Sequence, residues 1–193
     1  MDMSAIQQLN FLDIVILILL FRICYVAVKT GLPVELFKLT GTFSAIYLSL
    51  HYYIFLNDLM RRKSDPAIMP LKFTDFLIFI FLAIAGYLFF TFLRVIFFNF
   101  IKLEAVPALS KWGGLALGFF RGIFLLGLIC FALSVSNLSY LNKSAMSSYL
   151  AGRASNVAPD TYKWLWNTIF SKFMGSEKSN KNAVMALHNF FHR

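Results

Sequence analysis

Four long runs of apolar residues dominate the sequence, and each is long enough to cross the hydrocarbon core of a bilayer as a helix. A spanning helix needs about 20 predominantly apolar residues. The runs cover about residues 11–28, 39–56, 75–98 and 112–135. Of the 193 residues, 59% are hydrophobic and 14% are charged, whereas soluble domains have about 45–50% and 25%. The sequence therefore predicts an all-α integral membrane protein with four spans.

The segments between the runs predict tight connections. Gly31 and Pro33 interrupt the first connection, and both residue types break helices. Short links place successive spans antiparallel to each other. We therefore expect residues 1–138 to form a four-helix transmembrane domain and residues 139–193 to form a polar tail.

A periodic pattern predicts an amphipathic helix in this tail, over about residues 159–175. Pro159 suits the first turn of a helix, and Gly175 would end it. Apolar residues recur between them at helical spacing, at Tyr162, Leu165, Trp166, Ile169, Phe170 and Phe173. We favour a helix that lies in the headgroup plane. The alternatives are a helix that covers the end of the bundle and one that pairs with a second copy.

Tryptophans and lysines supply candidate anchors at the membrane interface, where aromatic side chains with a polar end and long cationic side chains are favoured. They are Trp112, Trp164, Trp166, Lys163 and Lys172.

Two stripes of small residues predict close helix packing. They are Gly114, Gly118 and Gly122 in the fourth run, and Gly41, Ala45 and Ser49 in the second. Helices in lipid associate where small residues let their backbones approach. We interpret the stripes as packing surfaces, either between the second and fourth spans or between protomers of a homo-oligomer.

Ionisable residues also lie in or beside the apolar runs, and charges within a membrane are functional-site hypotheses by default. They are Asp13, Arg22, Glu35, Arg94 and Arg121. The sharper interpretation is a basic vestibule that attracts anions or acidic lipid headgroups. The plainer one is that the arginines extend to the headgroup boundary, and we favour it for Arg22 and Arg94, which lie near the ends of their spans.

Arg121 lies deeper, about nine residues into its run. At 100° per residue it shares a helix face with Gly114 and Gly118, so we expect it to point into the protein. A buried guanidinium needs a partner. The candidates are Glu35 and the backbone carbonyls near Gly31, and we predict that Arg121 reaches toward this first connection.

Patterns typical of enzymes and metal sites are missing from the sequence. Cys24 and Cys130 lie in apolar runs, where a thiol behaves as a small hydrophobe. His188 and His192 have the spacing of helical zinc ligands but no acidic or cysteine residue close by. The sequence contains neither a phosphate-binding loop nor a nucleophile elbow. We expect no catalytic activity, no cofactor and no metal.

Several short motifs, in order, resemble the colicin V production protein family. They are Asn10-x-x-Asp13 at the start of the first run, Gly31 and Glu35 in the first connection, Gly41, His51-Tyr52-Tyr53, and the segment from Gly114 to Gly122 that includes Arg121. The likeness covers about the first 135 residues. It implies four spans in the bacterial inner membrane and a part in the production or secretion of a toxin, and it implies no particular reaction.

Two functions from different classes follow. The first is a pore-like or accessory membrane component required for colicin V production. The alternative is a membrane scaffold that recruits a partner through its basic amphipathic tail. The net charge of +9 suggests anionic lipids rather than nucleic acid as the partner of so hydrophobic a chain. A second copy of the chain and a membrane or secretion partner are further expected partners.

Overall fold

The computed structural model describes residues 11–63, 71–100, 107–135 and 148–173, and all regular secondary structure in these ranges is helical. This confirms the predicted all-α class. The helices are α2 (Phe11–Thr30), α3 (Leu32–Lys63), α4 (Leu71–Phe100), α5 (Pro107–Val135) and α7 (Tyr149–Leu165), and the π-helical turn η1 (Trp166–Phe170) joins α7 to α8 (Ser171–Phe173).

Three of the described helices are long and apolar enough to cross a membrane. These segments are Phe11–Thr30, Phe76–Phe100 and Ala108–Ser134. The fourth expected run, at about residues 39–56, lies inside α3, which does not meet the same criterion. Polar side chains in this run, such as Thr42, Ser49 and His51, lower its mean hydropathy. Length and composition therefore support three of the four expected spans.

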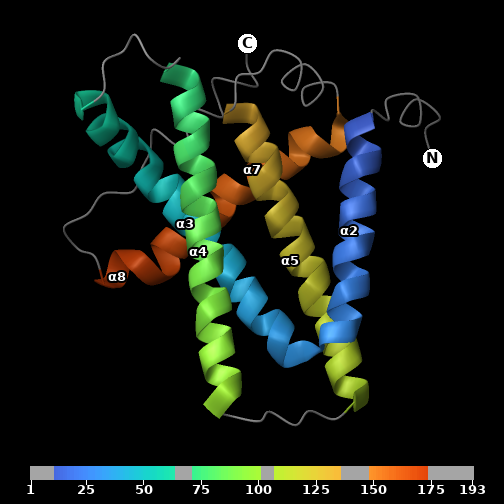
Figure 1. Cartoon of the computed structure of the whole chain (residues 1–193). Coiled ribbons are helices and arrows are strands. Elements are labelled where there is room, and N and C mark those ends of the chain that lie inside the picture. The colour runs from blue at the N-terminus through green and yellow to red at the C-terminus, as the bar shows by residue number, and fades with distance from the viewer. Residues whose placement is uncertain (1–10, 64–70, 101–106, 136–147, 174–193) are drawn as a thin grey trace.

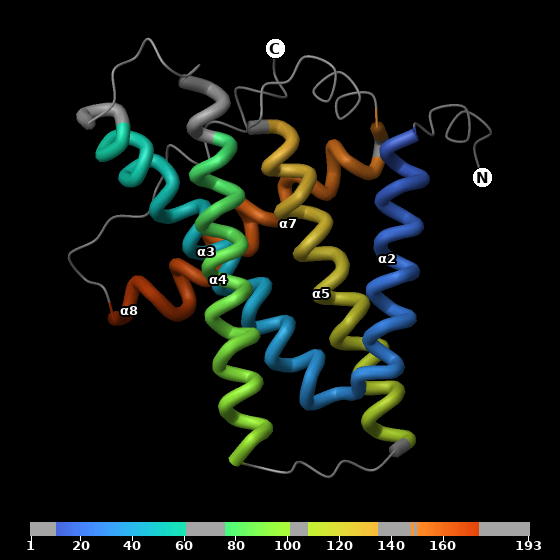
Figure 2. The backbone as a smooth tube through the Cα atoms, in the orientation of Figure 1, coloured from blue at the N-terminus to red at the C-terminus, as the bar shows by residue number. Residues whose placement is uncertain are grey.

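Helix α5 is inclined between α2 and α4, and α3 runs obliquely from the lower end of α2 and passes behind α4 (Figure 1). The most extensive contact is between α3 and α4, and α5 packs against α2, α3 and α7. In Figure 2 the turn that joins α2 to α3 lies level with the lower part of α5. This arrangement brings the first turn of α3 between α2 and α5.

The glycine stripe of α5 packs on α2. A Cβ atom at Gly114 would lie 2.7 Å from the carbonyl oxygen of Ala27, and one at Gly122 would lie 2.6 Å from Cδ1 of Leu20. A Cβ atom at Gly118 would collide with the Cβ of Ala27. The stripe is therefore a packing surface inside one protomer, and its partner is the first span rather than the second.

The small residues of α3 face α4 instead. A Cβ atom at Gly86 of α4 would lie 3.0 Å from the backbone of Ala45, and one at Gly41 would lie 3.2 Å from the Cβ of Phe90. Ser49 is fully buried, and its hydroxyl donates to the carbonyl of Ile46. The two stripes thus join two different helix pairs, because α3 crosses the bundle instead of lying along α5.

The tail helix begins about ten residues earlier than the sequence pattern predicted. Ser148 caps α7 by accepting a hydrogen bond from the backbone N–H of Ala151 at 3.0 Å, and Pro159 lies inside the helix instead of in its first turn. The apolar stripe had indicated only the second half of the helix, because the first half is rich in Ala, Gly and Ser. Residues from 174 onward, including Gly175, lie outside the described residues.

The apolar face of α7 completes the core of the bundle. Ala158, Tyr162 and Leu165 are buried with residues of α3, α4 and α5. Trp166 is only 7% exposed and stacks on His51, with 5.2 Å between the ring centroids. Its predicted role as an interface anchor is therefore wrong. The other proposed anchors, Trp112, Trp164, Lys163 and Lys172, have exposed side chains.

Replacing Gly118 with leucine is expected to force α5 away from α2. Overpacking of this kind costs about 1–3 kcal/mol, so the variant should have a lower thermal unfolding midpoint in detergent. Ala116→Leu is the matched control, because Ala116 is exposed on the same helix. Equal unfolding midpoints for the two variants would contradict the packing described here.

Candidate functional site

The turn between α2 and α3 places an acidic residue beside α5. Gly31 has a φ of 80°, a left-handed conformation that favours glycine. Its N–H donates to the carbonyl of Ala27 at 3.1 Å, and the N–H of Leu32 donates to the hydroxyl of Ser110 of α5 at 3.3 Å. These two hydrogen bonds fix the turn beside α5. Glu35, in the first turn of α3, is therefore directed into the protein.

Glu35 is the centre of a buried charge cluster, which comprises Thr30, Glu35, Lys38 and Arg121. Its side chain is fully buried. Oε1 accepts a hydrogen bond from the hydroxyl of Thr30 at 2.7 Å and forms an ion pair with Nζ of Lys38 at 2.6 Å. Oε2 lies 2.9 Å from Nε of Arg121. One carboxylate therefore joins α2, α3 and α5.

The predicted pairing of Arg121 with Glu35 is present in the structure. The Arg121 side chain is 8% exposed, so it points into the protein, as its position on the glycine face indicated. Its Nε lies within ion-pair distance of Glu35 Oε2 without the alignment of a hydrogen bond. The attraction between them is therefore mainly electrostatic.

Lys38 and Thr30 belong to this cluster, although sequence reasoning did not single them out as site residues. Lys38 follows Glu35 by three residues, and this spacing places opposite charges next to each other on a helix. That signal was available in the sequence. Thr30 is separated from Glu35 by the turn, and only the left-handed conformation at Gly31 brings their side chains within hydrogen-bond distance.

Asp13 serves a different site, at the opposite end of α2. It is fully buried and accepts hydrogen bonds from the hydroxyl of Ser148 at 2.6 Å and the backbone N–H of Leu150 at 3.0 Å. A carboxylate at a helix N-terminus satisfies unpaired N–H groups and interacts favourably with the helix dipole. Asp13 therefore fixes the start of α7 against the start of α2.

The other two predicted intramembrane charges do not join the cluster. Arg22 is exposed on α2 and Arg94 is half-buried on α4. Neither forms an ion pair with any residue of the described ranges. That these arginines extend toward headgroups stays a prediction.

His51 lies in an aromatic cluster that holds α7 to α3. Its Nδ1 is 2.8 Å from the hydroxyl of Tyr162, and its ring lies between those of Tyr47 and Trp166. In the part of the chain that the structure describes, no group of three or more His, Cys, Asp or Glu residues could hold a metal ion. The ring of His51 joins α3 to α7 through stacking on Trp166 and the contact of Nδ1 with the Tyr162 hydroxyl.

A family model described as colicin V production protein matches residues 12–176. The chain belongs to the colicin V production protein family. The match contains the whole charge cluster and both partners of the Asp13 contact. Family membership connects the chain with colicin V production, and the three apolar helices agree with a membrane protein. Neither a curated protein nor a solved structure matches the chain.

A double-mutant cycle tests the ion pair between Arg121 and Glu35. Glu35→Leu leaves Lys38 and Arg121 without their counter-ion and should lower the free energy of unfolding by about 3–5 kcal/mol, whereas Arg121→Leu leaves Glu35 paired with Lys38 and should cost less. The double variant should lose less than the sum of the two losses, by about 1–3 kcal/mol. Unfolding in mixed micelles provides the measurement, and strictly additive losses would contradict the coupling.

Proposed function

We propose that this chain is a multi-pass protein of the bacterial inner membrane that supports colicin V production as an accessory component without catalysing a reaction. Its activity depends on the buried charge cluster of Thr30, Glu35, Lys38 and Arg121. Membership of the colicin V production family supports the biological role.

The observation that carries the proposal is the ion pair of Glu35 with Arg121, buried where α2, α3 and α5 meet. Buried ion pairs are often no more stabilising than apolar residues of the same volume, because removing the charges from water is costly. In a membrane the cost is greater, and ionisable residues there usually mark functional sites. A cluster of three charges is therefore better explained by a function than by stability alone.

Packing of α3 supports a fourth crossing of the membrane. The backbones of α3 and α4 approach each other closely at Ala45 and Gly86, and α4 contains one of the apolar segments. Polar side chains of α3 such as Thr42 and Ser49 are buried in the protein. A helix that directs its polar groups inward can lie in the membrane beside α4 despite its lower hydropathy.

Two features favour an accessory role over the other candidate functions. Large side chains, including Phe79, Phe131 and Tyr162, fill the core between α3, α4, α5 and α7, which favours an accessory component over a pore within one copy. The apolar face of α7 is buried in that core, so it is not available to recruit a partner. Self-association stays a prediction. The contact surface between two copies would differ from the glycine stripe of α5, because that stripe packs against α2.

The proposal predicts that Arg121→Leu impairs colicin V production more than Arg22→Leu. Losing the ion pair should reduce colicin V production by on the order of tenfold. A tenfold loss corresponds to about 1.4 kcal/mol less stabilisation of the arrangement of α2, α3 and α5 that supports production. Arg22 is exposed, so its replacement should have little effect. The assay is growth inhibition of a sensitive strain by cells that carry each variant as their only copy. Both variants must reach the membrane in equal amounts, and equal colicin V yields would refute the proposal.

An accessory role also predicts that the purified chain alone conducts no ions or small solutes. Reconstituted liposomes loaded with a fluorescent dye or with potassium provide this measurement, with protein-free liposomes as the baseline. A flux that requires the native chain and disappears in Arg121→Ala would instead favour the pore-like form of the function.

A further inference from the structure

The charge cluster contains more positive than negative charge. Lys38 and Arg121 both contact the single carboxylate of Glu35. Among the residues that the structure describes, two cations against one anion leave one positive charge, and the exposed fractions of the Lys38, Arg121 and Glu35 side chains are 13%, 8% and 0%. An unneutralised charge in such an environment is costly. The cluster is therefore suited to accept one more negative charge.

The guanidinium of Arg121 also has unused donors. It reaches Glu35 through Nε, which is buried without an aligned hydrogen bond, and no hydrogen bond joins its two terminal nitrogens to another residue of the ranges 11–63, 71–100, 107–135 and 148–173. A guanidinium carries five N–H donors in a planar arrangement that matches two oxygens of a phosphate or carboxylate. Most of that capacity remains available for a ligand.

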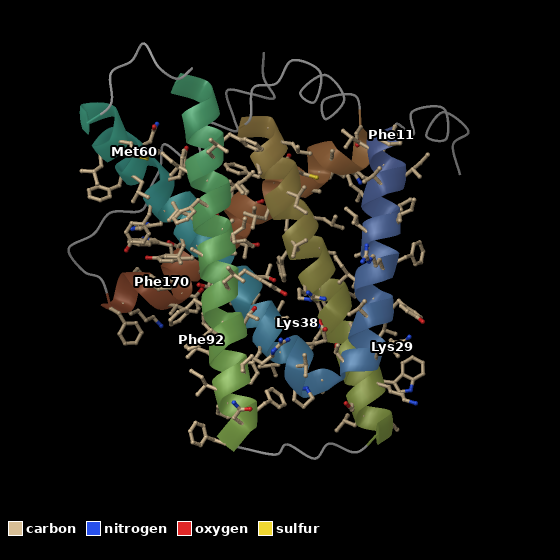
Figure 3. The ribbon with its side chains drawn as sticks, in the orientation of Figure 1. Phe11, Lys29, Lys38, Met60, Phe92 and Phe170 are labelled. Atoms are coloured by element: carbon tan, nitrogen blue, oxygen red, sulfur yellow. The ribbon has the colours of Figure 1, made fainter. Side chains whose placement is uncertain are left out.

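The cluster lies where α2, α3 and α5 meet, and Lys38 is its most exposed charged side chain. Figure 3 shows Lys38 between α4 and α5, on the first part of α3, and α4 and α5 make few direct contacts with each other. A side chain on a helix points toward the helix N-terminus, so Arg121 is directed back toward the α2–α3 turn. Thr30, Glu35 and Lys38 lie within eight residues of one another around the α2–α3 connection, the end of α2 at which the proposed membrane arrangement places lipid headgroups.

We propose that Lys38 and Arg121 bind the phosphodiester of an anionic lipid, with Glu35 holding both cations in place. This inference rests on the proposed membrane location and names the ligand of the same cluster. One phosphodiester carries one negative charge and neutralises the cluster. Its oxygens accept from the terminal nitrogens of Arg121, a geometry that a planar guanidinium favours, and Lys38 contributes a point charge.

Lipid binding to the purified full chain tests the assignment. The protein in a non-ionic detergent is titrated with phosphatidylglycerol, with zwitterionic phosphatidylcholine, or with inorganic phosphate, and bound ligand is counted by native mass spectrometry. Phosphatidylglycerol should bind at least about tenfold more tightly than phosphatidylcholine, as expected for one extra charge-assisted contact. Tight binding of inorganic phosphate would assign the same site to a free anion.

Charge variants identify the site. Lys38→Gln should weaken phosphatidylglycerol binding by about tenfold, and Lys38→Arg should retain it. Lys29→Gln is the matched control, because Lys29 carries the same charge near the same turn but is exposed and lies against the ring of Tyr25.

Equal affinities of the native chain for the two lipids would overturn the proposal, and so would equal losses in Lys38→Gln and Lys29→Gln. Both outcomes are independent of the proposed function, which is measured as colicin V production in cells. If lipid selectivity is absent while Arg121→Leu still reduces production, only the lipid assignment fails.

Discussion

The contacts of the buried Glu35 carboxylate hold together the part of the bundle where α2, α3 and α5 meet. This carboxylate is fully buried and contacts side chains of α2, α3 and α5 through Thr30, Lys38 and Arg121. Without it, two cations would lie close together in a medium of low dielectric constant, where their repulsion is far stronger than in water. The contact of α2 and α3 with α5 is therefore electrostatic at its centre.

Close backbone packing makes this contact possible. Gly114 and Gly118 let α5 approach the end of α2 so closely that no Cβ atom would fit, and this approach brings Arg121 within reach of the first turn of α3. Gly31 reverses the chain in a left-handed conformation, so α3 begins directly beside α5. Small residues thus determine how near the charged residues can lie, and the charges then determine which arrangement is stable.

The opposite end of α2 is fixed by a second buried carboxylate. Asp13 accepts hydrogen bonds from Ser148 and Leu150 and so holds the N-terminus of α7. From there α7 crosses behind α5 and α4 (Figure 1) and packs Tyr162 and Trp166 against His51. Both ends of the first span are therefore joined to later parts of the chain through acidic side chains, and the tail segment becomes part of the bundle.

The sequence by itself determined the all-α class, three membrane-compatible helices and the inward direction of Arg121 toward the first connection, because apolar length, helical periodicity and the need of a buried charge for a partner are local or nearly local properties. It left Glu35 and the backbone carbonyls near Gly31 as alternative partners, and the tertiary structure selected Glu35. Tertiary structure decided which helices the small residues join, since a glycine stripe permits close approach without specifying the partner. It also placed Trp166 in the protein core instead of at the membrane interface, because an apolar stripe packs equally well against lipid or against a protein core. The start of α7 at Tyr149 and the role of Asp13 depend on the long-range contact between Asp13 and Ser148. A periodic pattern in the sequence cannot predict such a contact.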